Sequence, residues 1–447
     1  MANNPDFGFD EYCDPSNPRK IKYDDIVAAS RRIVGAVCKT PLLKAHMSEK
    51  LGMDIYMKTE SMQMTGCYKE RGVRNTLMQL SDDQKKLGTI TATAGNHGIA
   101  MSYHAAQMGI PCIVVMPTIS PSNKIDKAQK FGAKVILHSN NVLDAKSHAM
   151  LIGRDKKMLY VNGFDHPHVI EGHGTVGLEI MEQLPLADAV LVPVGGGGLI
   201  TGVAIAIKHL KPDTEIYGIS TDKTCSMAES LRKNERVFLA IENTIADGLA
   251  VQTVGVNTFH NLKGLVDKMV IVKEDWVARA ITHLIEDEKL VVEGAGAVSM
   301  AAIMAGMFPN LKGKKVVCII SGGNIDTTIL SRTLERGMAA EGRLMKFKVS
   351  IQDRPGGMAD LCSLLAGIGV TIRDCLPERT WVKGDVFSVQ MKVVAETRGW
   401  DHSKEMIEQI KKHYKEYYFP DMSDRTEKLS NARRGPCLAP NPVCMQK

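Results

Sequence analysis

One lysine, Lys69, stands between a glycine-containing turn and a stretch with apolar residues at helical spacing. The chain reads Thr-Gly-Cys-Tyr-Lys-Glu-Arg-Gly from residue 65 to residue 72. This pattern places Lys69 at the N-terminus of a helix, where the helix dipole and burial both disfavour its ammonium form. A lowered pKa frees the amine to attack a carbonyl carbon, as Schiff-base chemistry requires. A solvated surface lysine is the ordinary alternative, and the other motifs of the chain are needed to choose between a reactive and a surface lysine.

Four consecutive glycines lie between an apolar run, Ala187–Val194, and a second helical pattern, Leu199–Leu210. The apolar run predicts a parallel strand buried on both faces. A loop of bare N–H groups at a helix N-terminus binds anions, and phosphate is the usual occupant. The segment lacks the Gly-Lys-Ser/Thr of a P-loop and the spacing of the dinucleotide fingerprint. It therefore favours a phosphate without naming the ligand, and a flexible turn is the alternative.

Two further turns follow predicted strands. The first, Thr-Ala-Gly-Asn-His-Gly at residues 93–98, offers backbone N–H groups, an amide and an imidazole. These groups suit a carboxylate and one hydrogen bond to an aromatic hydroxyl, although Asn96 could be only a helix N-cap. The second, Ser-Gly-Gly-Asn at residues 321–324, could consist of turn glycines alone.

All four motifs are predicted at the C-terminal ends of strands, where open α/β sheets bind ligands. A reactive lysine calls for an aldehyde, and the glycine run calls for a phosphate. Pyridoxal phosphate carries both groups. The four motifs together indicate this cofactor far more specifically than any one of them does.

Composition excludes several other classes. The 447 residues are 44% hydrophobic and 24% charged, with a net charge of +6 and no basic patch with interleaved aromatics, so nucleic acid is not the expected partner. No apolar run approaches the roughly 20 residues that span a bilayer. The N-terminus lacks the features of a secretory signal. Ten scattered cysteines without a C-x-x-C pair predict reduced thiols, a cytoplasmic location and no structural zinc.

The order of predicted elements suggests several regions. Residues 1–20 are predicted to be a loose arm, and residues 21–335 alternate strands and helices, as in an α/β domain with a smaller subdomain nested at about 80–165. Residues 345–417 read strand-helix-strand-strand-helix-strand, the order of a ferredoxin-like unit. Residues 418–447 are polar with scattered prolines, which predicts a disordered tail.

The four motifs resemble those of the fold-type II pyridoxal-phosphate enzymes, and within them the threonine/serine dehydratases, or ammonia-lyases. The resemblance covers about residues 25–335. It implies an α/β fold of two open parallel-sheet subdomains. Residues 346–415, with Asp-Arg-Pro-Gly at 353–356, resemble the ACT-type regulatory domain that many of these enzymes carry. That second resemblance implies a small-molecule effector, and the family implies a homo-oligomer, either a dimer or a tetramer.

The resemblance also implies a set of cofactor-binding residues. Lys69 would carry the cofactor on its amine and then move the α-proton of the substrate. The glycines would bind the phosphate, Asn96 the ring hydroxyl, and Tyr68 would pack near the ring. Ser321 would face the pyridine nitrogen. The full set is Lys69, Tyr68, Asn96, Gly195, Gly196, Gly197, Gly198, Gly248 and Ser321.

The substrate carboxylate would lie in the turn formed by Thr93, Ala94, Gly95 and His97. Related serine racemases carry a serine at the position of Ala94, and that serine acts as acid and base on the face opposite the lysine. Alanine transfers no proton, which counts against racemisation. Many relatives also bind a divalent cation through carboxylates where this chain has Ser220 and Ser226, so we expect no metal. Glu293 lacks the proline that usually follows the glutamate in the family, so the resemblance links it to the site only loosely.

The resemblance thus implies a lyase that acts on a small amino acid. The expected reaction is α,β-elimination from L-threonine to 2-oxobutanoate and ammonia, with L-serine to pyruvate as a second activity. A hydroxyl at Ser321, unlike a carboxylate, cannot keep the pyridine nitrogen protonated, and this favours prompt elimination over transamination. Two alternatives remain: a serine racemase, and a catalytically silent amino-acid sensor with the ACT-like unit as its reporter.

Overall fold

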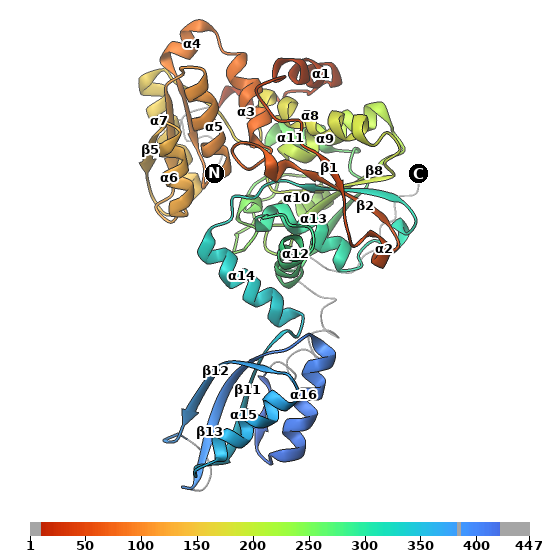
Figure 1. Ribbon diagram of the computed structural model, residues 1–447. Coiled ribbons are helices and arrows are strands. Elements are labelled where there is room, and N and C mark those ends of the chain that lie inside the picture. Colours follow the sequence, from red (N-terminus) through yellow and green to blue (C-terminus); the bar gives the residue numbers. More distant parts are fainter. Residues whose placement is uncertain (1–9, 382–385, 421–447) are drawn as a thin grey trace. The chain divides into compact units, whose positions relative to one another are not determined.

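The computed structural model describes residues 10–381 and 386–420 (Figure 1). The chain divides into two compact units, Met1–Leu330 and Ser331–Lys447. Among the described residues, no helix has both the length and the apolar composition needed to cross a membrane. Seven cysteines of these residues are free thiols, as expected.

The larger sheet of the first unit has six strands in the order β1-β2-β10-β7-β8-β9, all parallel except β1. The central strands β7 and β10 are apolar along most of their length and are covered on both faces, as continuous Val/Ile runs predict. The strands are β1 (Leu42–Lys44), β2 (Asp54–Thr59), β7 (Ala189–Pro193), β8 (Glu215–Thr221), β9 (Lys268–Val272) and β10 (Lys315–Ile320).

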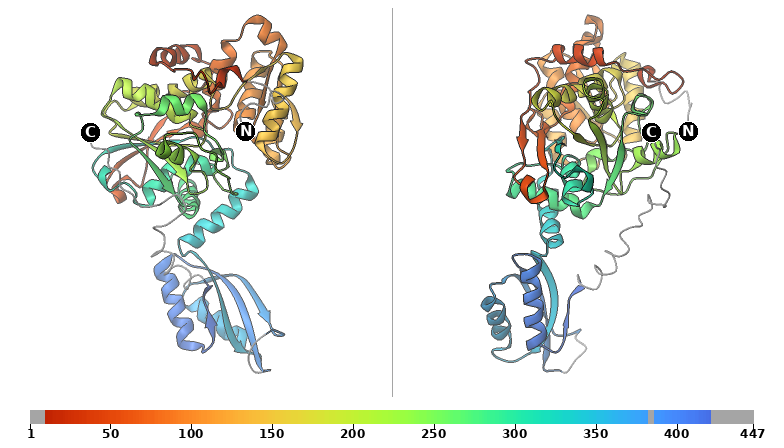
Figure 2. Two further views of the ribbon diagram at one scale, coloured as in Figure 1. Left: turned by 180° about the vertical axis from the view of Figure 1, so that it is seen from behind. Right: turned by 90° about the vertical axis from the view of Figure 1, so that its right-hand side faces the viewer.

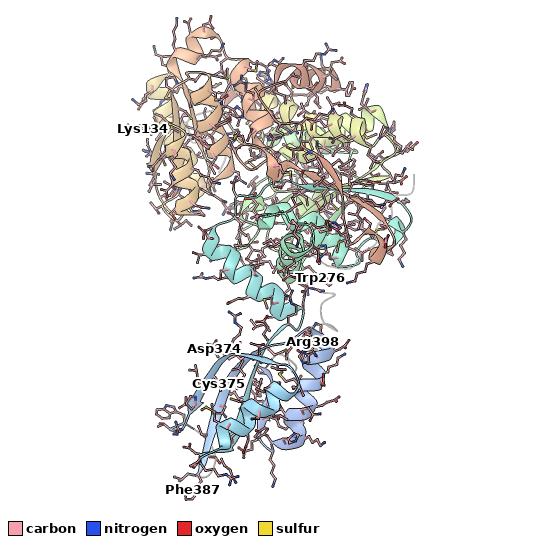
Figure 3. The ribbon with its side chains drawn as sticks, viewed as in Figure 1. Lys134, Trp276, Asp374, Cys375, Phe387 and Arg398 are labelled. Carbon is pink, nitrogen blue, oxygen red and sulfur yellow. The ribbon has the colours of Figure 1, made fainter. Side chains whose placement is uncertain are left out.

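A second, four-stranded parallel sheet lies within the same unit, in the order β5-β4-β3-β6. Its strands are β3 (Thr89–Ala92), β4 (Cys112–Met116), β5 (Lys134–Leu137) and β6 (Leu159–Tyr160). Its helices α5, α6 and α7 gather around it as a separate group (orange to yellow in Figure 1). Lys134, labelled in Figure 3, begins the edge strand β5 and is exposed; a charged edge discourages pairing with other chains. Two parallel sheets with helices on their faces confirm the predicted α/β class.

Three of the helices that connect and cover these strands, α3, α5 and α9, begin at the turns that the sequence singles out. The helices are α1 (Tyr23–Arg32), α2 (Ser48–Leu51), α3 (Lys69–Met78), α4 (Asp82–Leu87), α5 (Asn96–Gln107), α6 (Ser122–Lys130), α7 (Val142–Lys156), α8 (Pro167–Gln183), α9 (Gly198–Leu210), α10 (Ser226–Lys233), α11 (Val256–Leu262), α12 (Glu274–Glu286), α13 (Gly294–Met304) and α14 (Thr327–Ala340).

The second unit contains an antiparallel sheet in the order β12-β13-β11-β14. Its elements follow the predicted order: β11 (Leu344–Gln352), α15 (Gly357–Gly367), β12 (Thr371–Glu378), β13 (Ser388–Glu396), α16 (Trp400–His413) and β14 (Tyr417–Tyr418). Alternate residues of β11 and β13 are buried, because α15 and α16 cover one face of the sheet (Figure 2). This is the strand order of a ferredoxin-like unit.

Two predicted loose segments are more ordered than expected. The backbone N–H of Arg19 donates to Asn257 Oδ1 at 2.7 Å, and Asn257 Nδ2 donates to the Tyr12 carbonyl at 2.7 Å. These bonds attach residues 10–20 to α11, so the prediction of a loose arm is wrong for that part, and residues 1–9 lie outside the described residues. The predicted tail starts slightly too early, since Tyr418 pairs with β11 and Phe419 is buried; residues 421–447 lie outside the described range.

A buried ion network holds the start of α3 in place. The guanidinium of Arg71 contacts both oxygens of Glu60 at 2.7 and 2.8 Å and both oxygens of Glu179 at 2.6 and 2.8 Å. Lys58 extends the network, because its Nζ lies 2.6 Å from Glu179 Oε2 and 2.7 Å from the Thr40 carbonyl. The network thereby connects β2, α3 and α8, and it fixes the helix two residues after Lys69.

We predict that Arg71→Met lowers the free energy of unfolding by about 3–5 kcal/mol, because it leaves the carboxylate of Glu60 buried without its cation. Urea denaturation measures the change. Arg31→Met is the matched control, because Arg31 is exposed on α1, and it should stay within about 0.5 kcal/mol of the unaltered protein. Equal stability of the two variants would show that the network contributes nothing.

Candidate active site

Lys69 is the first residue of α3, as the sequence predicts. Its side chain is partly buried, and its Nζ donates to the carbonyl of Gly163 and lies 5.0 Å from the centre of the Tyr68 ring. Burial lowers the pKa of Lys69 to about 8. At that pKa about a tenth of the amines are neutral at pH 7, far more than for an ordinary lysine. The amine is therefore suited to react with an aldehyde.

The four glycines connect β7 to α9, and a side chain would not fit at any of them. A Cβ at Gly195 would lie 2.8 Å from Leu249 Cα, and one at Gly197, where φ is +101°, would lie 2.9 Å from Thr258 Cβ. Side chains at Gly196 and Gly198 would collide with Phe164. Within the described part of the chain, no hydrogen bond is donated by the backbone N–H groups of these glycines. The loop thus keeps close-packed walls and bare donors, as an anion site requires.

Two consecutive residues, Gly163 and Phe164, link the lysine to the glycine loop. Gly163 accepts the hydrogen bond from Lys69 Nζ, and the next residue, Phe164, packs its ring on Gly196 and its carbonyl on Gly198. Asn162 holds this segment by accepting from the backbone N–H groups of residues 164 and 165 at 3.1 and 3.0 Å. The amine and the glycine loop therefore face the same small region.

The turn at residues 93–98 opens α5, and Asn96 is the first helical residue. Asn96 is held from both ends, because its Nδ2 donates to Glu293 Oε1 at 2.6 Å and its Oδ1 accepts from Asn324 Nδ2 at 3.1 Å. Thr93 Oγ1 accepts from the backbone N–H of Gly95 at 3.1 Å, and Ala94 is exposed. The alternative that Asn96 is only an N-cap is therefore wrong: the N-cap is Gly95, and the side-chain amide of Asn96 contacts residues from two distant segments.

Two buried histidines beside the lysine are neutral. Burial, and then the charge of Lys69, lowers the pKa of His97 to about 3. His97 Nε2 lies 3.3 Å from the Val161 carbonyl. The pKa of His173 is also far below its usual value, chiefly because of burial, and its ring packs edge-on against Tyr68 with the ring centres 4.7 Å apart. Neither imidazole therefore competes with Lys69 as a charged proton donor near pH 7.

The last two predicted residues are Ser321, which lies next to the Lys69 segment, and Gly248, which lies next to the glycine loop. The carbonyl of Ser321 accepts from the Tyr68 backbone N–H at 3.1 Å, and Gly322 forms a β-bridge with Cys67. Gly248 belongs to a short 3-10 helix (η4, Asp247–Leu249) whose Leu249 packs on Gly195. The segments that carry the predicted residues are thus linked in one network, in part through residues 163, 164, 293 and 324.

Sequence reasoning left Glu293, the residue immediately before α13, out of the set of site residues. It is 3% exposed, and its Oε2 has no hydrogen-bond partner among the described residues. Burial raises its pKa to about 7. Because the usual proline is missing after Glu293, the sequence motif is incomplete. In the structure, the hydrogen bond from Asn96 places the Glu293 carboxylate at the candidate site. The described residues contain no group of three or more His, Cys, Asp or Glu able to hold a metal ion.

These residues fit pyridoxal phosphate. The bare N–H groups of Gly195–Gly198 match its phosphate, and the Lys69 amine, with its lowered pKa, matches its aldehyde. Asn96 and the Tyr68 ring line the same region. A Cβ at any of the four glycines would collide with the residues packed on the loop, so only glycine keeps the backbone N–H groups in this position.

Comparison with known proteins decides the family. The family model described as "Pyridoxal-phosphate dependent enzyme" matches residues 33–322, which is more than half of the chain. The chain belongs to this family. Pyridoxal phosphate is accordingly its cofactor.

The relatives of this pyridoxal-phosphate dependent enzyme include an L-threonine ammonia-lyase of Thermotoga maritima, 39% identical over 86% of this chain and 96% of the relative. Threonine deaminase isoform 2 from Solanum lycopersicum has a solved structure with a TM-score of 0.67 and 35% identity, over 72% of this chain and 95% of that one. Maize serine racemase gives a TM-score of 0.68 at 29% identity, over 72% and 99%.

We predict that the apo-enzyme takes up pyridoxal phosphate faster as pH rises, with the rate levelling off above about pH 8. The sign follows because only the neutral amine attacks an aldehyde, and the Lys69 amine is protonated below its pKa. The growth of visible absorbance after mixing measures the rate. A free lysine derivative is the control, and its rate should rise up to about pH 10. The same upper limit for the protein would contradict the lowered pKa.

Proposed function

We propose that this enzyme is an L-threonine ammonia-lyase that forms 2-oxobutanoate and ammonia, with L-serine to pyruvate as a second activity. The observation that carries the proposal is a reactive amine, Lys69, between an anion-binding loop and a turn suited to a carboxylate. The relatives named L-threonine ammonia-lyase support the choice of substrate, because the match covers nearly their whole length.

The proposed roles follow from the positions of the side chains. Lys69 Nζ removes the α-proton of the substrate, because its amine is partly neutral near pH 7. When bound, the cofactor supplies the electron sink for the electrons left at the α-carbon. The turn of Thr93, Ala94, Gly95 and His97 binds the carboxylate, and Asn96 orients the ring hydroxyl.

Ser321 and the two neutral histidines limit side reactions. The proposed neighbour of the pyridine nitrogen is the hydroxyl of Ser321, which does not hold a proton on that nitrogen as a carboxylate does. Electron withdrawal is then moderate, which favours early loss of the β-hydroxyl. The hydroxyl leaves as water when Lys69 returns to it the proton taken from the α-carbon. The product of elimination is an enamine, whose imine form hydrolyses in water to the oxo acid and ammonia. His97 and His173 are neutral near pH 7, so neither is an imidazolium acid that could compete in the proton transfer.

A serine racemase is the second candidate, because maize serine racemase has a similar fold. Racemisation needs a proton donor on the face opposite Lys69. The residue at the position that serves this purpose in racemases is Ala94, whose methyl group cannot donate a proton. A silent amino-acid sensor is disfavoured because Lys69 keeps a lowered pKa, which a mere binding site does not need.

The proposal extends to the division of the chain. Residues 21–335 would form the catalytic domain, with a smaller subdomain at about 80–165, and residues 345–417 an ACT-like regulatory domain that binds a small effector near Asp353–Gly357. The order of β11 to β14 supports this, as does the length of the match with the Thermotoga relative, 387 residues, which exceeds the 330 of the first unit. The family resemblance adds a homo-oligomer, dimer or tetramer, and a cytoplasmic location.

We predict that the protein releases 2-oxo acid from L-threonine and L-serine but not from their D-isomers. Lys69→Ala should abolish both oxo-acid release and the visible absorbance of bound cofactor, because the variant lacks the amine that reacts with the aldehyde, while circular dichroism stays unchanged. Normal turnover of threonine by that variant would refute the role of Lys69. Release of D-serine from L-serine, seen by chiral chromatography, would favour the racemase, and cofactor absorbance without oxo acid would favour the sensor.

The same assay, repeated with and without branched-chain amino acids, tests the proposed regulatory domain. A change in rate that disappears in Asp353→Asn would support effector binding in that loop. Asp353 is exposed and pairs with Arg379 Nε at 2.7 Å, so the substitution leaves the buried core of the second unit untouched. An effect that the variant keeps in full would place the effector elsewhere.

A further inference from the structure

A second buried lysine lies next to the substrate turn and has no part in the roles assigned so far. Lys124 belongs to α6 of the smaller sheet (Figure 1) and is 4% exposed. Its Nζ lies 2.6 Å from Oδ2 of Asp247, which belongs to η4 beside the glycine loop. The ion pair therefore connects the smaller-sheet group to the larger one, next to the candidate site.

The side chain of Lys124 lies directly against the turn at residues 93–98. A Cβ at Gly95 would overlap the Lys124 stem and would lie 3.2 Å from its Nζ. Gly95 has a φ of 175°, an extended conformation open to any residue, so space for the lysine is what requires glycine at this position. The ammonium of Lys124 therefore lies beside Gly95, in the turn proposed to bind the carboxylate.

The turn itself offers no positive charge. Thr93, Ala94 and Gly95 are uncharged, and His97 is neutral because burial lowers its pKa to about 3. A carboxylate that enters this region loses hydration, and neutral donors replace only part of it. Burial lowers the pKa of Lys124, but Asp247 and Glu293 outweigh burial, so its pKa is raised and the group stays charged. A charge-assisted hydrogen bond from this ammonium would supply the positive charge that the turn does not offer to a carboxylate.

We propose that Lys124 binds the α-carboxylate of the amino-acid substrate, and that Asp247 holds its ammonium until the carboxylate replaces it. The inference rests on the proposed function, because it assigns the substrate class to an α-amino acid with a free carboxylate. The exchange is feasible because the side chain of Asp247 is 45% exposed, so water can solvate its carboxylate once the lysine turns away. Asp247 Oδ1 also keeps its hydrogen bond from the Gly248 N–H at 2.8 Å.

Three variants of the holoenzyme separate this proposal from a purely structural ion pair. Lys124→Met should raise KM for L-threonine by about 100-fold with a smaller change in kcat, since it removes a buried partner of the carboxylate. Asp247→Asn should lower KM, because the substrate no longer competes with a charge. Lys124→Arg should restore most of the affinity. Lys130→Met, an exposed lysine of the same helix, is the matched control and should leave KM unchanged.

A structural bridge predicts a different pattern: both Lys124→Met and Asp247→Asn would impair the enzyme in the same direction, and that result would overturn the proposal. Propionate, a carboxylate without an amino group, gives a readout that does not depend on turnover. Its binding, followed by calorimetry, should be lost in Lys124→Met and retained in Lys130→Met. Equal propionate binding in both variants would also overturn the proposal. If the unaltered protein releases no oxo acid from any amino acid, the proposed function fails, and propionate binding still tests Lys124.

Discussion

The guanidinium of Arg71 lies between Glu60 and Glu179, and the position of the reactive lysine depends on this contact. Fully buried charges are costly unless each one is paired and hydrogen-bonded, so the four bonds of Arg71 allow one orientation only. Because Arg71 is two residues from Lys69 on the first turn of α3, the same bonds fix where the amine points. Lys58 balances the second carboxylate and attaches α8 to β2.

Around this fixed amine, the site is built from uncharged donors and neutral rings. Burial keeps the imidazoles of His97 and His173 neutral, and it also lowers the pKa of Lys69. Bare backbone N–H groups of the glycine loop supply positive potential without a titrating side chain. Lys124 and Asp247, two charged groups beside the turn, form an ion pair. Proton transfer is thereby concentrated on few groups, with Lys69 first among them.

Features that depend only on neighbouring residues could be predicted from the sequence. Lys69 at a helix start, the glycine loop after a strand and Asn96 at a strand-end turn are local patterns, and the structure has all three where they were expected. Contacts between distant segments could not be predicted. Asn96 meets Glu293 across 197 residues, and Lys124 meets Asp247 across 123. Such pairs depend on the order of the strands in the sheet, which the local sequence does not specify. The attachment of residues 10–20 to Asn257 is another long-range contact, and composition alone therefore suggested a loose arm.

The central claim is that one amine, on Lys69, carries the cofactor. Borohydride reduction of the holoenzyme, followed by peptide mass mapping, tests it most directly because reduction makes the link to the lysine permanent. The account predicts a pyridoxyl group on Lys69 and unmodified peptides for Lys58 and Lys124. A pyridoxyl group on another lysine, with Lys69 unmodified, would contradict it.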